Sequence, residues 1–285
     1  MDINKYKITS DIKLSEIKTD NTDNIELKKD TEKLLEEHIQ RMTKFHDMLY
    51  AQNKYALLII IQAMDTAGKD GTIKHVMSGF NPQGTQVHSF KQPSQEELDH
   101  DYLWRASKNL PERGQIGIFN RSYYEDVLVV KVHDLLKNSQ IPSELLINVW
   151  ENRYRQIRNF EQYLYENGII TVKIFLHISK DEQKKRLIER IDDKTKNWKF
   201  SAADIKERQY WDDYQRCYED AIRETTTDKS PWYVIPADKK WFARLAVSEI
   251  ISQTLENLKL TYPEVSEKQS EDLKELKHKL LNNEV

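Results

Sequence analysis

The feature that most constrains this chain is an apolar run followed at once by a glycine-containing loop. Residues 55–61 read Tyr-Ala-Leu-Leu-Ile-Ile-Ile, and residues 63–71 read Ala-Met-Asp-Thr-Ala-Gly-Lys-Asp-Gly. A buried strand that turns into such a loop builds an anion site, because backbone N–H groups at the start of the next helix point at the ligand. Lys69 then reaches the outer oxygens of that ligand. A helix-compatible run over 72–77 follows, so the sequence predicts binding of a phosphoryl compound.

The loop departs from the usual phosphate-loop (P-loop) pattern at two positions. Ala63 stands where the first glycine would be, and Asp70 replaces the Ser or Thr that would hold Mg²⁺. Asp65 and Asp70 bring two carboxylates to an anion site, which predicts a divalent cation between the carboxylates and the phosphate. Thr72 is a weaker candidate for the missing hydroxyl. The alternative is a surface turn with a solvated lysine, which the preceding apolar strand disfavours.

Composition restricts the class of protein. The longest apolar stretches are about strand length, so we expect no membrane span. The single cysteine, Cys217, excludes an internal disulfide framework and a Cys-based zinc site and fits a cytoplasmic protein. The formal net charge is −3, so any site for a polyanion must be a local basic groove on a mildly acidic body.

Strand-like and helix-like segments alternate along the chain. Alternation of this kind predicts an α/β fold with a mostly parallel five-stranded sheet covered on both faces. The predicted strands are 55–61, 85–90, 115–120, 169–178 and 232–236, and the predicted helices after the loop are 95–109, 142–167, 180–191 and 238–260. Parallel sheets bind ligands beyond the carboxyl ends of their strands, where Asp65, Asn120 and residues 177–179 all lie.

The two ends of the chain have different expected roles. Residues 1–53 read as a helical adapter, with a long helix from about Thr31 that packs on the sheet. Residues 264–285 form a charged tail, either a solvated helix or a frayed end, with an oligomer contact as the less favoured alternative. Since the chain has no linker rich in Pro, Gly or Ser, residues 1–263 are interpreted as one domain.

A second polar cluster follows the predicted strand at 115–120. Arg121 offers a planar fork suited to a bidentate phosphate contact. An acidic residue at this place normally holds Mg²⁺, but the first polar residue is Asn120. Glu125 and Asp126 are therefore the predicted metal or base carboxylates. The alternative is that these two acids only complement a helix dipole.

A third cluster is basic and lies within residues 184–208, with Trp198 and Phe200 among its members. Such a segment fits a mobile lid over about 186–209 that closes on substrate and supplies cations. Arg186 and Arg190 lie four apart and so share one helix face. A solvated helix face is the preferred interpretation for Lys184, Lys185 and Lys206, and the neighbouring acids Asp192, Asp193 and Asp204 argue against a nucleic-acid track. Further basic candidates are Lys74, one turn into the helix after the loop, Lys91, Arg105, Lys108, Arg113 and Lys131.

Together these segments resemble the polyphosphate kinase 2 family. The resemblance runs from about Leu27 to Pro263 and rests on the following ranges: 62–72, 80–84, 100–105, 119–128, 195–201 and 231–241. It implies a P-loop kinase fold of the thymidylate-kinase type, three-layered and with a helical lid. It also implies phosphoryl transfer between inorganic polyphosphate and adenine or guanine nucleotides, with Mg²⁺ (or Mn²⁺ in its place). The segment 124–128, Tyr-Glu-Asp-Val-Leu, is closer to members that accept both AMP and ADP.

The resemblance and the residues together give the predicted site. The catalytic set is Asp65, Lys69, Arg121, Glu125 and Asp126, and the metal ligands are sought among Asp65, Glu125 and Asp126. The phosphate-binding set is Ala67, Gly68, Lys69, Asp70, Gly71, Thr72, Lys74, Arg186 and Arg190. The nucleotide and lid set is Lys91, Arg121, Asp193, Lys194, Trp198, Lys199 and Arg208. The expected assembly is a dimer or tetramer, with no nucleic-acid or membrane partner. The alternatives are an ATP-dependent nucleoside monophosphate kinase and a non-catalytic polyanion-binding protein.

Overall fold

A five-stranded, wholly parallel sheet forms the centre of the computed structural model, which describes residues 1–9, 11–26, 29–195, 197–199 and 202–283. The strands are β1 (Ala56–Ala63), β2 (Thr85–Ser89), β3 (Ile116–Asn120), β4 (Ile169–His177) and β5 (Trp232–Pro236). Their order across the sheet is β2-β3-β1-β4-β5. All five predicted strands and their parallel arrangement are therefore confirmed.

Strand β1 lies in the middle of the sheet and is buried along all eight residues. It pairs with β3 on one side, where Ile61 is opposite Asn120, and with β4 on the other, where Ala63 is opposite Leu176. A strand covered on both faces needs a continuous apolar run instead of alternation, which residues 56–61 supply. The chain runs to opposite sides of β1 in its two halves, so the loop after β1 lies at the point where open α/β sheets bind ligands.

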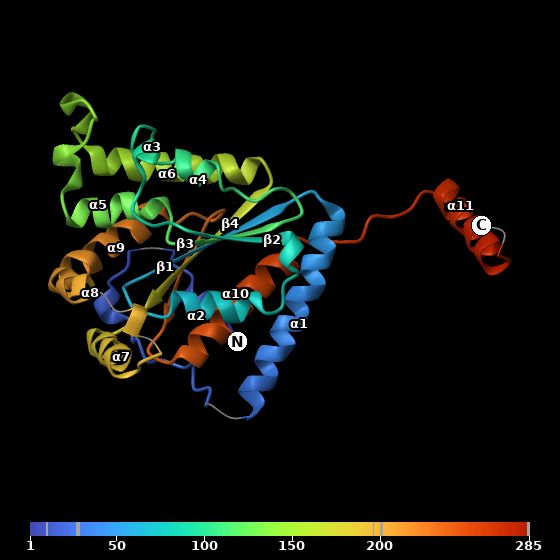
Figure 1. The fold of residues 1–285 in the computed structure, drawn as a ribbon, viewed down its shortest axis with the longest axis horizontal. Coiled ribbons are helices and arrows are strands. Elements are labelled where there is room, and N and C mark those ends of the chain that lie inside the picture. The colour runs from blue at the N-terminus through green and yellow to red at the C-terminus, as the bar shows by residue number, and fades with distance from the viewer. Residues whose placement is uncertain (10, 27–28, 196, 200–201, 284–285) are drawn as a thin grey trace.

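Helices cover both faces of the sheet and complete a three-layer fold (Figure 1). One face carries α1 (Lys29–Gln52), α2 (Lys69–Met77) and α10 (Lys240–Asn257), and the other carries α5 (Val129–Val132), α6 (Val149–Glu166) and α9 (Trp211–Thr225). Helix α10 packs between α1 and the sheet and is buried at residues as far apart as Phe242 and Leu255. The long helix expected in the N-terminal segment is α1, but it packs mainly on α10 and not on the sheet as expected.

Two of the helix predictions need correction, and one helix was missed. The segment 95–109 is two short helices, α3 (Gln95–Leu98) and α4 (Trp104–Ser107), because the Asp101 carboxylate accepts a hydrogen bond from the Leu103 N–H and interrupts the helix. The helix expected from 142 begins only at Val149, after Asn148 adopts a left-handed φ of 53°. Helix α9 was not predicted.

The segment predicted as a lid is mostly helical in its described part, with a turn at residues 194–195. It contains α7 (Lys180–Asp192), which Ser179 caps by accepting a hydrogen bond from the Glu182 N–H, and α8 (Ala202–Glu207). Short 3-10 turns make up the other helical elements. These turns are Ile3–Tyr6, Leu14–Glu16, Pro82–Gly84, Tyr123–Val127, Leu135–Asn138, Ser143–Leu146, Asn197–Lys199 and Arg208–Tyr210.

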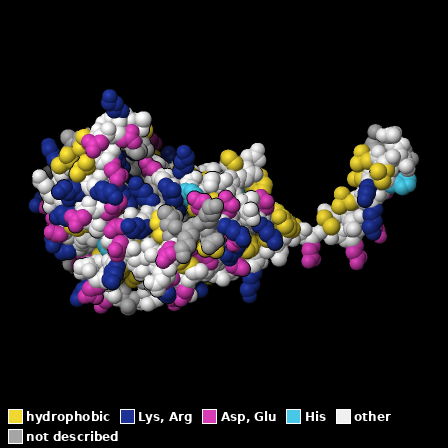
Figure 2. All heavy atoms as spheres, turned by 90° about the horizontal axis from the view of Figure 1, so that it is seen from below, with side chains coloured by type: hydrophobic (Ala, Val, Ile, Leu, Met, Phe, Trp, Pro, Cys, Tyr) yellow, Lys and Arg dark blue, Asp and Glu magenta, His cyan; other side chains and the backbone are white. Residues whose placement is uncertain are grey.

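The tail forms helix α11 (Glu267–Leu281), which projects away from the body of the molecule (Figure 1). In the space-filling view, apolar side chains follow this tail, while Lys/Arg and Asp/Glu are mixed over the body (Figure 2). Among the helices that the structure describes, none is both long and apolar enough to span a bilayer.

Candidate active site

The loop between β1 and α2 has the backbone shape of an anion-binding turn. Thr66 has a φ of 63° and Gly68 a φ of 106°. Glycine adopts this left-handed region without strain, whereas a β-branched residue such as Thr66 does so only where its surroundings hold it. A Cβ at position 68 would meet Arg186 at an ordinary 3.7 Å, so it is the backbone angle that favours glycine there.

Lys69 begins α2 and extends back along the loop. Its Nζ donates a hydrogen bond to the Ala63 carbonyl, 3.0 Å away, so the ammonium group lies near the carboxyl end of β1. Burial lowers the pKa of Lys69, and the positive charge of Arg121 lowers it further. A cation held at this place without full solvation has a strong electrostatic preference for an anionic ligand.

Arg121 forms ion pairs with two of the three predicted carboxylates, Asp65 and Glu125. Its Nη2 lies 2.9 Å from Asp65 and its Nη1 lies 3.4 Å from Glu125. Glu125 raises the pKa of Arg121, and Asp65 does so to a lesser extent. The Arg121 backbone has a φ of 62° and its N–H donates to the Ile61 carbonyl at 3.1 Å. The strained backbone directs the guanidinium across the end of β3 toward the loop.

Asp126, unlike its neighbour Glu125, is paired with an arginine of α6 and not with Arg121. Its carboxylate is 3.7 Å from Arg153, on α6, and the Arg153 guanidinium also donates to the Asp126 carbonyl. Burial raises the pKa of Asp126 to about 6, with Arg153 opposing the rise. Asp126 therefore faces α6 whereas Glu125 faces Arg121, and its predicted catalytic role stays a prediction.

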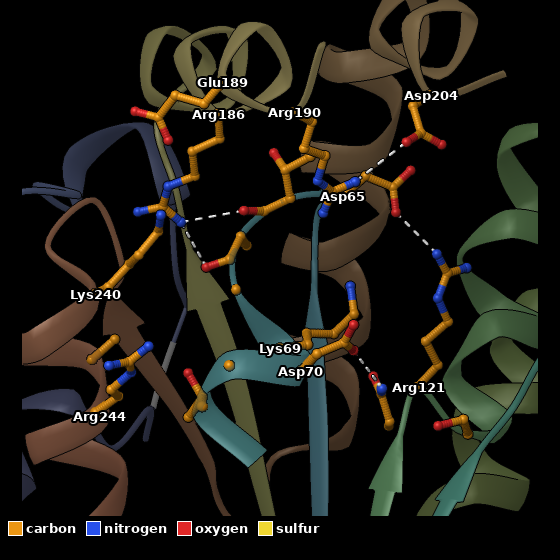
Figure 3. Close-up of a pocket in the computed structure, with 18 of the residues that line it drawn as sticks. Asp65, Lys69, Asp70, Arg121, Arg186, Glu189, Arg190, Asp204, Lys240 and Arg244 are labelled. Carbon is orange, nitrogen blue, oxygen red and sulfur yellow. Dashed lines mark hydrogen bonds and ion pairs between the residues drawn. The ribbon is translucent and has the colours of Figure 1, made fainter. Parts of the chain in front are cut away.

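A cavity of about 760 Å³ lies over the loop, between α7, α10 and the ends of β1 and β3 (Figure 3). Seven Lys or Arg residues and four Asp or Glu residues line it. The cations are Lys69, Lys91, Arg121, Arg186, Arg190, Lys240 and Arg244, and the acids are Asp65, Asp70, Glu189 and Asp204. The wall also includes the loop residues Ala67, Gly68, Gly71 and Thr72.

The family model for polyphosphate kinase 2 matches residues 25–263 of this sequence. The chain belongs to the polyphosphate kinase 2 family.

Two of the similar relatives and one solved structure match over most of their length. The chain is 53% identical over 259 residues to the ADP-polyphosphate phosphotransferase of Rhodopseudomonas palustris, which covers 90% of both chains. It is 49% identical over 225 residues to the AMP/ADP-polyphosphate phosphotransferase of Meiothermus ruber, covering 79% of this chain and 81% of the relative. The crystal structure of polyphosphate kinase 2 from Arthrobacter aurescens superposes with a TM-score of 0.85 at 41% identity, over 92% of this chain and 91% of that one.

Two cations that line the cavity of this chain, Lys240 and Arg244, were not predicted from the sequence. Both come from α10 and lie on the opposite side of the loop from Arg121 (Figure 3). Their spacing of four residues on the helix that follows the last strand was the available signal, since such a pair shares one helix face. Asn120 also lines the cavity, where its amide donates to the Asp70 carboxylate at 3.0 Å.

The two predicted lid arginines have different environments. Arg190 lies on the cavity wall, 3.5 Å from Asp204. Arg186 is almost fully buried, with 3% of its side chain exposed, and donates to the backbone carbonyls of Thr66 and Ala67 (Figure 3).

The other predicted lid residues lie outside the cavity wall as far as the structure describes them. Arg208 donates to the Lys180 carbonyl and to Gln183, and Trp198 is 78% exposed. Asp193 accepts from Thr195 beyond the end of α7, where Lys194 is also exposed. Lys74 is exposed on α2 and does not line the cavity. Residues 196, 200 and 201 and the side chain of Lys199 lie outside the described part.

The acidic residues at the site are suited to a divalent metal ion whose remaining ligands come from the substrate and water. Among the described residues, no three His, Cys, Asp or Glu side chains gather into a self-sufficient metal cluster. Mg²⁺ at phosphoryl-transfer sites typically takes one or two carboxylates together with waters and substrate phosphates. Asp65, on the cavity wall, and Glu125, joined to it through Arg121, offer donors of that kind.

Proposed function

We propose that this protein transfers phosphoryl groups between inorganic polyphosphate and nucleoside mono- or diphosphates, forming ADP or ATP. The observation that carries this proposal is the cavity wall, where seven cations outnumber four acids on a chain whose net charge is −3. These cations extend from Arg121 at one side of the loop to Arg244 at the other (Figure 3). A wall that is basic well beyond the P-loop lysine suits a donor longer than a nucleotide's own phosphates.

Positioning and charge neutralisation supply most of the chemistry in this scheme. The terminal phosphate of the chain and the acceptor oxygen of the nucleotide lie in line over Lys69, which neutralises charge on the moving phosphoryl group together with Arg121. Asp65 and Glu125 hold Arg121 from its two sides and fix the plane of its fork. Since the acceptor phosphate is already ionised at neutral pH, no general base and no covalent enzyme intermediate are required.

We propose Mg²⁺ as the cofactor, with Mn²⁺ able to replace it. Asp65 would hold the ion, with Glu125 as the partner carboxylate. When bound, the metal neutralises phosphate charge and makes the two acids compatible with an anionic substrate.

The nucleotide preference is proposed from the relatives and from the segment 124–128. Similar proteins are named for ADP, for AMP and ADP together, and, at 34% identity over 189 residues, for GDP. We propose that this chain accepts both AMP and ADP, with GMP and GDP as further candidate substrates.

The decisive assay mixes the purified protein with Mg²⁺, ADP and long-chain polyphosphate and omits ATP. ATP formation supports the proposal, and Lys69→Ala is the matched loss-of-function control. A second reaction contains AMP and ATP without polyphosphate. Turnover only in that second reaction would favour an ATP-dependent monophosphate kinase. Binding of polyphosphate with no turnover in either reaction would favour a non-catalytic protein.

Assembly and location are proposed on separate grounds. The leucines at 273, 276 and 280 of α11 are exposed at helical spacing and offer a face for self-association, which supports a dimer or tetramer. The free, buried Cys217 suits a reducing cytoplasm. Light scattering of the full chain and of a chain ending at residue 263 tests the assembly: an equal number of subunits in the two would exclude the tail from the interface.

A further inference from the structure

Every N–H of the Arg186 guanidinium has an acceptor within the protein. A guanidinium carries five N–H donors. Nε donates to Glu182 at 2.8 Å, Nη1 donates to the Thr66 and Ala67 carbonyls at 3.3 and 2.8 Å, and Nη2 donates to the Ala237 and Asp238 carbonyls at 2.7 and 2.9 Å. With 3% of the side chain exposed, this arginine has no donor left for a substrate phosphate.

The carbonyls that Arg186 holds belong to the anion-binding loop. Gln183, one turn earlier on α7 and 2% exposed, donates to the Asp65 carbonyl at 3.1 Å. Three successive loop carbonyls, at 65, 66 and 67, therefore point toward α7. In a loop that binds an anion through its N–H groups, carbonyls that turned inward would repel the ligand. The bonds from α7 keep these three directed away from the cavity.

The same bonds stabilise the strained conformation at Thr66. A β-branched residue with a φ of 63° needs its surroundings to hold it, and the Arg186 bond to the Thr66 carbonyl does so directly. The guanidinium's other side is also fixed. Asp238, whose carbonyl it holds, accepts from the Ser179 N–H at 2.8 Å and from the Thr19 hydroxyl at 2.7 Å. Arg186 thus joins the loop, α7 and the β5–α10 turn.

We propose that Arg186 is a positioning residue that holds the P-loop in its anion-receiving conformation, assisted by Gln183, and that it does not contact the polyphosphate chain. The effect on turnover rests on the proposed function, whereas the effect on the loop does not. Arg190, four residues later on the same helix, is the contrasting case. It lines the cavity and has one hydrogen-bond partner among the described residues, Asp204, so it can contact the chain directly.

The test measures amide hydrogen exchange in the full-length protein without substrate. The peptide 64–72 covers the loop and the first turn of α2 and has protected amides to follow. In the loop, the Ala67 N–H donates to the Met64 carbonyl, and in α2 the Thr72 N–H donates to the Gly68 carbonyl. Arg186→Met should raise their exchange rate about tenfold or more, since a bond from a charged donor is worth at least about that factor. Gln183→Met should raise it less. Lys184→Met, exposed on the same helix, and Arg190→Met should leave it unchanged.

Kinetics give the second readout. Arg186→Met should lower kcat about tenfold or more with tripolyphosphate and with long-chain polyphosphate alike, whereas Arg190→Met should mainly raise KM for the long chain. If Arg186→Met does not fold, Gln183→Met and Arg186→Lys carry the same comparison. The proposal would be overturned if the Arg186 variants exchanged their loop amides at the wild-type rate and had a raised KM for long-chain polyphosphate. If the wild type does not turn over polyphosphate, the proposed function fails. The exchange result then still decides whether Arg186 positions the loop.

Discussion

Replacing Lys173 with methionine should destabilise the protein by about 3–5 kcal/mol, because it leaves a buried carboxylate without its counter-ion. Lys173, on β4, lies 2.5 Å from Glu161 of α6, and the two side chains are 0% and 1% exposed. Lys173 also donates to the Thr225 carbonyl at 2.7 Å. Glu161 accepts from Tyr123, Tyr124 and Ser230, each at 2.8 Å. This network anchors the turn 123–127 that carries Glu125.

The assay is urea unfolding followed by tryptophan fluorescence, arranged as a double-mutant cycle. Glu161→Gln alone should cost a similar amount, since it leaves Lys173 as an unpaired buried cation. The double variant should cost at least about 2 kcal/mol less than the sum of the two single variants, because neither charge is then left alone. Lys33→Met is the control, since its pair with Glu37 is exposed at 3.9 Å and should matter by less than about 1 kcal/mol. Single-variant costs below about 1 kcal/mol, or strict additivity, would show that Lys173 and Glu161 do not neutralise each other as a buried pair.

Three further predictions concern the site. Arg121→Lys replaces a fork held between Asp65 and Glu125 with a point charge, so kcat should fall about a hundredfold or more; a steady-state kcat near wild type would contradict this role. The folded-state pKa of Asp126 is raised to about 6 from an ordinary 3.8, so the folded state binds the proton more tightly and the wild type should lose stability as the pH rises from 4 to 7. Relative to Asp126→Asn, that loss should reach roughly 3 kcal/mol in unfolding titrations, and a difference independent of pH would exclude the burial argument. Chelation with EDTA should abolish turnover and added Mg²⁺ restore it, with Asp65→Asn needing about tenfold more Mg²⁺; an unchanged Mg²⁺ requirement would remove Asp65 from the metal.

The strands and the loop could be predicted because their signals are local. The run 56–61 is apolar at every residue, as a strand covered on both faces requires, and Gly68-Lys69 comes seven residues after its end. Helix α9 was missed although its buried residues, Trp211, Tyr218 and Ile222 among them, recur at helical spacing, because it directly follows a segment interpreted as a lid. The break at Asn148 depends on one left-handed residue, which hydrophobic periodicity does not report.

The roles of the two lid arginines could not be separated from sequence. Both lie on one face of α7, four residues apart, and periodicity gives them the same direction. What distinguishes them is the partner each meets: Arg186 meets loop carbonyls that are about 120 residues earlier in the chain, and Arg190 meets the open cavity. Likewise, Asp126 differs from its neighbour Glu125 because Arg153 of α6 lies beside it. Such contacts depend on tertiary packing, which the local pattern does not specify.

In the proposed reaction, polyphosphate donates its terminal phosphoryl group to a nucleotide over Lys69. The most direct measurement incubates the protein with ³²P-labelled polyphosphate, Mg²⁺ and unlabelled ADP, and then locates the label. Label should appear in the γ-phosphate of ATP with the wild type, at a rate about a thousandfold lower with Lys69→Ala. Label that never enters ATP would exclude polyphosphate as the donor, and label that enters it equally fast in the Lys69 variant would exclude the role of Lys69.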